Sequence, residues 1–257
     1  MTPPTAAATT TPARVVLVHG SMDRAASFAK VARRLEELEV VRYDRRGYAS
    51  RVGEPPATTL DEHVDDLLDQ VGAGPAAVVG HSLGGVLALM AAVRAPARVT
   101  SVGAFESPMS WRPEWPRTSA GGNALAAGDP GDAAEAFLRG ILGERVWSRL
   151  GSRTRAERRA EGPALVAELA ALRAAAPYDP AAVPVPVLAG YGTESKPYHQ
   201  EAARRLAAEA HDGELVVVEG SGHGVHLTHP ADFAAFVRRV VQRMPSIAPC
   251  PTPPPST

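Results

Sequence analysis

A serine flanked by glycines carries the clearest chemical signal in this sequence. The run Gly80-His81-Ser82-Leu83-Gly84 follows an apolar segment of strand character and precedes a helical run. A serine at a sharp strand-to-helix turn requires neighbours with almost no side chain, and the N–H groups at the helix start favour a developing negative charge. The pattern predicts that Ser82 is a nucleophile and that His81 contacts the substrate. A glycine-rich turn with an incidental serine would explain the spacing, but not the strand and helix that flank it.

A second glycine-rich run holds a candidate base. His223 lies in Gly220-Ser221-Gly222-His223-Gly224, after another apolar run, so a loop at the carboxyl end of a strand carries it. A histidine placed in this way can take a proton from Ser82. His226 and His229 follow closely and raise the alternative of a metal site. No carboxylate or cysteine lies nearby at a suitable ligand spacing, so we expect no metal, and structural roles for these two histidines.

A turn after the first apolar run supplies candidate donors for an oxyanion. His19-Gly20-Ser21-Met22 directly follow the run Val15–Val18. A backbone N–H in such a turn, paired with the N–H of Leu83, would bind the negative oxygen that forms when Ser82 attacks a carbonyl group. We assign the donor in the turn to Ser21, with Met22 as the alternative. An ordinary turn at a strand end is the other interpretation of the same residues.

These candidate residues require a scaffold that brings strand ends together. Short apolar runs, mostly continuous, alternate along the chain with amphipathic helical patterns. This alternation predicts an α/β fold with a mostly parallel sheet of about six strands and helices on both faces. The expected strands are Val15–His19, Val40–Asp44, Ala76–Gly80, Val99–Phe105, Val185–Gly190 and Glu214–Val218. The expected helices are Ser27–Leu38, Thr59–Val71, Leu83–Arg94, Tyr198–Ala210 and Ala231–Arg243.

One region interrupts this alternation. Residues 108–180 contain no convincing strand, but a stretch rich in Trp and Pro and helical segments such as Ala133–Leu142 and Ala164–Ala174. We predict that this region forms a helical lid over the carboxyl edge of the sheet, where open α/β sheets bind ligands. The remaining expected boundaries are a core at 13–107 and 181–244, a flexible leader at 1–12 and a Pro-rich disordered tail at 245–257.

Composition and charge narrow the classes of partner. The chain has 257 residues, 45% of them hydrophobic, and a formal net charge of −1, so it can bury a core and has no electrostatic basis for binding nucleic acid or an anionic membrane. Cys250 is the only cysteine, which excludes an intramolecular disulfide. We find neither a signal peptide nor a membrane-spanning run, and we therefore expect a soluble cytoplasmic protein that acts on a small molecule.

Taken in order, the motifs HGSM, YDRRGYASR, GHSLGG and GSGHGVHLTHP resemble those of the α/β-hydrolase superfamily. The resemblance covers roughly residues 14–243. It implies an α/β-hydrolase fold, a Ser–His–acid triad of the serine hydrolase and esterase type, and no cofactor. It also implies that the Asp44-Arg45-Arg46-Gly47 stretch supports the site structurally. The short N-terminus departs from the family pattern, because it leaves little room for two initial antiparallel strands, and we expect a weak hairpin at best.

The acid of the triad does not follow the common pattern. In much of the superfamily it is an Asp just after the strand that matches Val185–Gly190, but here Ser195 stands at that position and Glu194 one position earlier. Glu106 ends the preceding expected strand, and the Glu-Ser-Pro run that it begins resembles a motif in a subset of members that lack the usual Asp. We assign the acid to Glu106, whose carboxylate would orient His223, and keep Glu194 as the alternative.

The leading functional hypothesis is a hydrolase that cleaves a carboxylic ester, thioester or lactone through an acyl-enzyme. Met109, Trp111 and Trp115 in the expected lid indicate an apolar substrate-binding pocket. Two other classes can use the same scaffold: a lyase or cyclase that needs no covalent step, and a non-catalytic small-molecule receptor. The pair Ser82 and His223 argues against the receptor, because binding alone needs no strained nucleophile.

Overall fold

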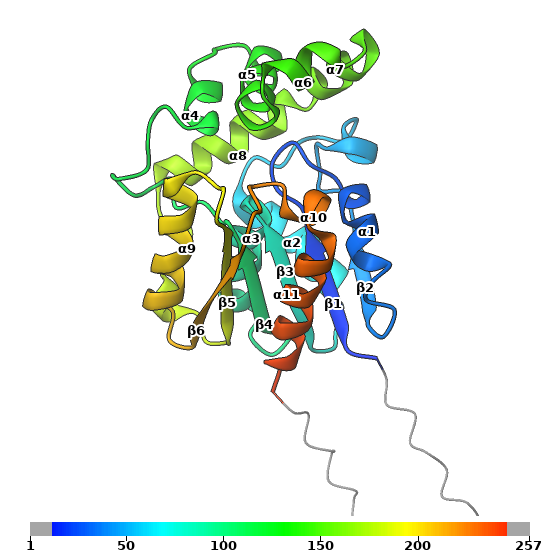
Figure 1. Ribbon diagram of the computed structural model, residues 1–257, viewed down its shortest axis with the longest axis vertical. Coiled ribbons are helices and arrows are strands. Elements are labelled where there is room, and N and C mark those ends of the chain that lie inside the picture. The colour runs from blue at the N-terminus through cyan, green and yellow to red at the C-terminus, as the bar shows by residue number, and fades with distance from the viewer. Residues whose placement is uncertain (1–11, 246–257) are drawn as a thin grey trace, which may run out of the picture.

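The computed structural model describes residues 12–245 and contains one sheet of six strands, each parallel to its neighbours, in the order β2-β1-β3-β4-β5-β6 (Figure 1). The strands are β1 (Arg14–Val18), β2 (Glu39–Arg42), β3 (Ala76–His81), β4 (Val99–Phe105), β5 (Val187–Gly192) and β6 (Gly213–Val218). This confirms the predicted fold class, and within the described range no hairpin precedes β1. Except for residues 12 and 245, the predicted leader and tail lie outside this range, and so does Cys250.

Helices cover both faces of the sheet, because its central strands are apolar on both sides. Every residue of β3 is buried, and β1 is buried from Val15 onward. One face packs against α2 (Leu60–Val71), α3 (Leu83–Arg94) and α9 (Pro197–Glu209), and the other against α1 (Ala29–Ala32) and α11 (Pro230–Gln242). The short α10 (Val225–Thr228) precedes α11. No helix within residues 12–245 combines the length and apolar character needed to cross a bilayer.

The strand order places a crevice between β1 and β3. The chain passes from β1 outward to β2 and then returns to the other side of β1 for β3, so the connections leave these two neighbouring strands in opposite directions. Loops at such a switch point diverge and leave room for a ligand at the carboxyl ends of the strands. Gly20 follows β1 and Ser82 follows β3, so both lie at this crevice.

Five helices lie between β4 and β5 and extend beyond the carboxyl edge of the sheet (Figure 1). They are α4 (Ala120–Leu125), α5 (Pro130–Leu142), α6 (Glu144–Arg149), α7 (Ser152–Ala160) and α8 (Gly162–Ala174), and we call them the insertion helices. Their apolar side chains form a separate core around the fully buried Trp147, which Met22 and Tyr48 join from outside the insertion helices. Asp129 caps α5 by accepting a hydrogen bond from the N–H of Asp132, and Pro130 occupies the first turn.

The first helix is much shorter than predicted. The expected helix Ser27–Leu38 is a 3-10 turn at Ala25–Phe28, then the single turn α1, and then further turns. After Arg33 the backbone hydrogen bonds span three residues instead of four, as in the bond from the Leu35 N–H to the Ala32 carbonyl. Leu35 remains fully buried, so core packing is kept while the tighter backbone leads directly into β2.

A buried arginine joins the sheet to the insertion helices. Arg45, 1% exposed, donates from Nε to the carbonyl of His19 and from Nη2 to that of Gly20, each at 3.0 Å, and from Nη1 to Glu168 at 2.9 Å. Tyr48 donates to the other oxygen of Glu168 at 2.5 Å. Burial alone would lower the pKa of Arg45, but the Glu168 carboxylate more than offsets this and raises it. The Asp44–Gly47 turn therefore holds the end of β1 and α8 together.

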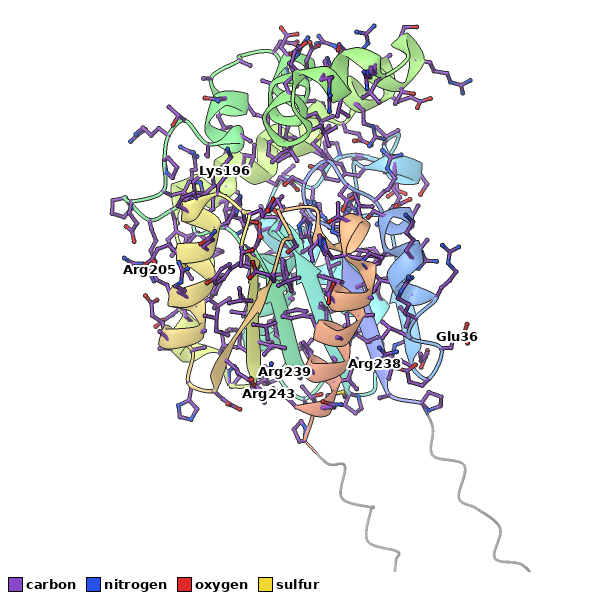
Figure 2. The ribbon with its side chains drawn as sticks, viewed as in Figure 1. Glu36, Lys196, Arg205, Arg238, Arg239 and Arg243 are labelled. Atoms are coloured by element: carbon purple, nitrogen blue, oxygen red, sulfur yellow. The ribbon has the colours of Figure 1, made fainter. Side chains whose placement is uncertain are left out.

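Ion pairs at the end of the molecule opposite to the insertion helices are more exposed than the Arg45–Glu168 pair. Arg239 of α11 and Arg243, just after it, lie near the amino-terminal edge of the sheet (Figure 2). Arg239 pairs with Glu214 there, and Arg243 pairs with Asp212. These pairs are in contact with water, so each adds little to the free energy of unfolding. In the Arg45–Glu168 pair, by contrast, both side chains are buried.

Glu168→Gln should lower the free energy of unfolding by about 3 kcal/mol, because it leaves the buried Arg45 charge without a counter-charge. Chemical denaturation measured by circular dichroism checks this. Glu157→Gln is the matched control: Glu157 pairs with Arg153 on the exposed surface of α7, and its loss should cost less than about 1 kcal/mol. Equal losses in the two variants would contradict the proposed attachment.

Candidate active site

Ser82 has a strained backbone that the surrounding chain holds in place. It lies between β3 and α3 with φ 53° and ψ −126°, in the left-handed region that residues with a side chain rarely adopt. The Ser82 N–H donates to the carbonyl of Phe105 at 2.8 Å, and its carbonyl accepts from the N–H of Gly85 at 2.9 Å. The turn therefore presents the serine side chain at the carboxyl edge of the sheet.

The glycines around Ser82 allow close backbone approach. A Cβ added to Gly80 would lie 2.1 Å from backbone atoms of Gly84, and one added to Gly84 would lie 2.1 Å from the carbonyl oxygen of Val18. A Cβ added to Gly20 would lie 2.8 Å from the Cβ of Ser82. The turn after β1 therefore packs directly against the serine.

Two of the predicted oxyanion donors border the cavity that contains Ser82. Ser21 and Leu83 line it, and Leu83 is the first residue of α3, so its N–H has no acceptor within the helix. Met22, the alternative donor, has φ 57°, and its side chain is buried among the insertion helices. The structure thus brings the turn after β1 and the start of α3 to one cavity.

A buried carboxylate contacts the predicted base. Glu106 follows β4 with φ 49°, and its Oε2 lies 2.6 Å from Nδ1 of His223. The other oxygen, Oε1, accepts a hydrogen bond from the N–H of Gly192 at 2.9 Å and another from the hydroxyl of Ser195. The ends of β4, β5 and β6 meet at this one carboxyl group.

These donors keep Glu106 ionised although no part of its side chain is exposed. Burial raises the pKa of a carboxyl group, but the hydrogen bonds from His223, Ser195 and Gly192 outweigh burial and lower the pKa of Glu106 overall. His223 remains one-fifth exposed and lines the cavity that contains Ser82. The imidazole therefore has a carboxylate on one side and the cavity on the other.

The alternative acid, Glu194, is exposed and does not contact Nδ1 of His223. Its backbone N–H donates to the carbonyl of Ser221 at 2.9 Å, which ties the loop after β5 to the loop of His223. The next residue, Ser195, is the one that points inward. The position of the family's usual Asp is therefore filled by a hydroxyl that donates to Glu106.

The cavity at Ser82 is lined mainly by the insertion helices and by loops at the strand ends. Its lining residues are Ser21, Ser82, Leu83, Pro108, Ser110, Trp115, Ser119, Ala120, Gly121, Phe137, Ile141, Leu169, Leu172, Arg173, Tyr198, His199 and His223. Of the lid residues that were predicted to contact substrate, Trp115 borders the cavity. Met109 lines a neighbouring groove, and Trp111 packs edge-on against Tyr178.

His81, predicted to contact substrate, is not among the residues that line the cavity of Ser82. Its side chain is buried, and its Nε2 lies 2.6 Å from the carbonyl oxygen of His223. Its ring also lies 4.5 Å from that of His226. Burial lowers the pKa of His81 well below its usual value, so the ring is neutral and Nε2 donates the hydrogen bond. Alternate residues along a strand face opposite sides of the sheet, so His81 and Ser82 point in different directions.

Two side chains at the start of α9 escaped prediction. The His199 ring stacks on that of His223 with a centroid separation of 4.5 Å, and Tyr198 borders the cavity beside Trp115. Burial lowers the pKa of His199 well below its usual value. The available signal was their position just after Ser195, since residues that follow a strand end in this fold lie at the edge that carries the site.

The chain belongs to the alpha/beta hydrolase family, whose model matches residues 15–236. Lipase LipV of Mycobacterium tuberculosis is 34% identical over 94 residues, a match that spans 35% of this chain and 36% of that relative. Two solved structures share the fold. The enol-lactonase of Burkholderia xenovorans LB400 has a TM-score of 0.70 at 20% identity, with 92% of this chain and 94% of that chain covered. The 2-hydroxy-6-oxo-6-phenylhexa-2,4-dienoate hydrolase of Rhodococcus sp. strain RHA1 has a TM-score of 0.66 at 20% identity, with 90% and 91% covered.

Gly80→Ala should lower the free energy of unfolding by about 3 kcal/mol and move Ser82, because the new methyl group meets backbone atoms that cannot rotate away. Thermal or denaturant unfolding measures the first effect. Gly74→Ala is the control, since a Cβ at the exposed Gly74 would meet nothing within 4 Å. Unfolding energies that are the same in both variants would show that the close approach at Gly80 is not required.

Proposed function

We propose that this protein is a serine hydrolase that cleaves a carboxylic ester, thioester or lactone of a small apolar molecule through an acyl-enzyme. The observation that carries the proposal is the 2.6 Å contact between Nδ1 of His223 and Glu106. It places an ionised carboxylate behind an imidazole that shares a cavity with Ser82. Membership of the alpha/beta hydrolase family supports hydrolysis as the reaction class.

In the first half of the reaction, the Oγ of Ser82 attacks the carbonyl carbon of the substrate and its proton passes to Nε2 of His223. The Glu106 carboxylate accepts the hydrogen bond from Nδ1, which fixes the tautomer and stabilises the imidazolium that forms. The N–H groups of Ser21 and Leu83 hold the negative oxygen of the tetrahedral intermediate. Collapse of this intermediate breaks the bond to the leaving group, which takes the proton from His223.

The second half releases the acyl group. A water molecule gives a proton to His223 as it attacks the acyl carbon, and the second tetrahedral intermediate collapses when Ser82 regains its proton. The carboxylic acid then leaves, and both side chains have returned to their starting states. No bound group other than water and substrate is needed to balance this sequence.

The lining of the cavity supports a small apolar substrate. Trp115, Phe137, Leu169 and Leu172 supply apolar surface, whereas Arg173 supplies a cation at the border. The Nη2 of Arg173 donates to Ser119 at 3.2 Å, so this cation is partly engaged. Pockets of this character bind through apolar contact and use a few polar groups for orientation.

Fluorophosphonate labelling tests the nucleophile. We expect the wild-type protein to be labelled once and Ser82→Ala not at all, because the probe reacts with an activated serine. Intact-mass measurement gives the result. An unlabelled wild type, or a Ser82→Ala variant labelled to the same extent, would exclude the acyl-enzyme. Turnover that persists in Ser82→Ala would favour a non-covalent lyase or cyclase instead.

Glu106→Gln should lower kcat for a p-nitrophenyl ester by a factor on the order of 10²–10⁴, because the amide cannot stabilise the imidazolium. Glu194→Gln is the matched control and should retain at least half of the wild-type kcat, since its carboxylate is exposed. Steady-state kinetics on the two variants make the comparison. A larger loss in Glu194→Gln than in Glu106→Gln would assign the acid to the loop after β5.

A further inference from the structure

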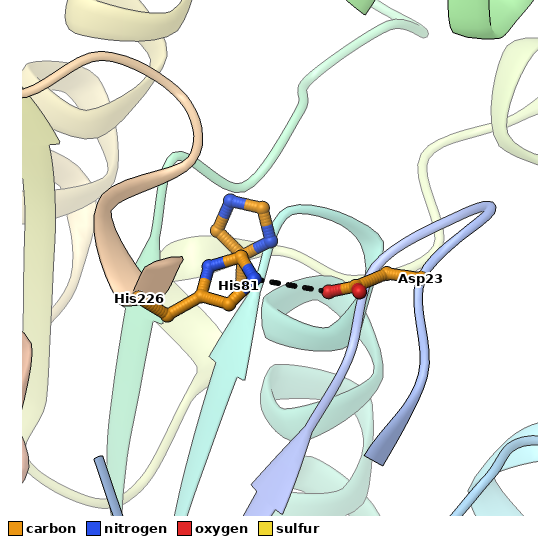
Figure 3. A group of neighbouring side chains, drawn as sticks. All are labelled: Asp23, His81 and His226. Carbon is orange, nitrogen blue, oxygen red and sulfur yellow. Dashed lines mark ion pairs between the residues drawn. The ribbon is translucent and has the colours of Figure 1, made fainter. Parts of the chain in front are cut away.

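Three side chains from different segments lie close together (Figure 3). Asp23 comes from the turn after β1, His81 from the end of β3, and His226 from α10. One nitrogen or oxygen atom of each lies within 4.8 Å of those of the other two. The cluster is separate from the contact between Glu106 and His223. It joins three segments that border the proposed active site: the turn after β1, the end of β3 and α10.

The two histidines of the cluster are buried, Asp23 is half-buried, and several of their polar atoms are incompletely bonded. The side chain of His226 is 3% exposed and that of Asp23 is 20% exposed. Within the described chain, Nδ1 of His81, both ring nitrogens of His226 and Oδ2 of Asp23 are buried without a hydrogen-bond partner. Nε2 of His226 nevertheless lies 3.1 Å from Oδ2 of Asp23, within the distance of an ion pair. Buried polar atoms in this state are typically satisfied by an ordered water molecule or a bound ion.

His81 is held in the tautomer that a metal requires. Its Nε2 donates to the carbonyl of His223 at 2.6 Å, so Nδ1 carries the free lone pair. Histidines that bind metals usually donate their other N–H to a carbonyl or carboxylate, which orients the ring. The backbone contact that removes His81 from the cavity thus prepares it as a ligand.

We propose that Asp23, His81 and His226 bind one divalent transition-metal ion of the Zn²⁺ type. Two imidazoles and one carboxylate are ligands that Zn²⁺ accepts, and a water molecule would complete a tetrahedral set. Zn–N and Zn–O bonds of about 2.0–2.1 Å hold neighbouring ligand atoms about 3.3 Å apart. The contact of 3.1 Å already matches this spacing, whereas atoms at the upper limit of 4.8 Å would have to approach one another by about 1.5 Å. The ion would therefore draw the three active-site segments together.

A second group with suitable ligands does not carry the same inference. Glu106, His199 and His223 also lie within 4.8 Å of one another. Both oxygens of Glu106, however, already accept hydrogen bonds from His223, Gly192 and Ser195. A cation there would also take the lone pairs that proton transfer requires, so any binding at that group should inhibit the enzyme.

Isothermal titration of the metal-stripped full chain with Zn²⁺ tests the proposal, with Co²⁺ absorption as a second measurement. All proteins carry Cys250→Ser, which removes the single thiol. We expect one ion per chain, tetrahedral Co²⁺ bands in the visible range and a higher Tm with Zn²⁺. Asp23→Asn and His226→Gln should each weaken Zn²⁺ binding about a hundredfold or more. Glu106→Gln and His199→Gln should leave it unchanged.

Two results would overturn the proposal: a wild-type protein that binds no ion, or binding that survives Asp23→Asn. In either case Asp23 and His226 form only a buried ion pair. Circular dichroism shows whether each variant is folded. If His226→Gln does not fold, Asp23→Asn still tests the site, because it preserves the shape of the side chain. Fluorophosphonate labelling is read separately, so failure of the metal site is distinguishable from failure of the proposed hydrolase activity.

Discussion

The buried guanidinium of Arg45 is the constraint around which the rest of the site is arranged. A cation that is 1% exposed must have its donors satisfied, and Arg45 uses the carbonyls of His19 and Gly20 and the carboxylate of Glu168. Two of these acceptors belong to the turn that packs against Ser82, and the third belongs to the insertion helices. One guanidinium therefore sets both the position of the turn after β1 and the position of the helices that line the cavity.

A second constraint explains why a serine stands at position 195. Glu106 takes up the space beside His223 from the end of β4, and a further carboxylate at position 195 would meet it as a like charge and raise the pKa of one of the two. The hydroxyl of Ser195 instead donates to Glu106 and helps to keep it ionised. The end of β4 thus supplies the carboxylate at Nδ1 of His223, and the loop after β5 supplies a donor to that carboxylate.

The sequence patterns predicted the features that depend on residues close together in the chain. Continuous apolar runs located the six strands, and the glycines at positions 80 and 84 located the turn of Ser82. The first helix was overestimated, because the amphipathic pattern continues to Leu38 although the backbone tightens after Arg33 to enter β2. The surroundings of His81 and Trp111, and the stacking of His199 on His223, depend on contacts between distant segments. Side-chain orientation of that kind has no signature in residue spacing.

The parallel sheet also decides where the molecule can be attached to something else. β1 begins, and α11 ends, at the edge of the sheet opposite to the insertion helices (Figure 1). The chain therefore enters and leaves the described fold on the side away from the cavity. A tag, a fusion partner or a solid support joined at either end would leave the mouth of the cavity open to solution. If both ends were joined at once, the linker would not have to pass across the mouth of the cavity.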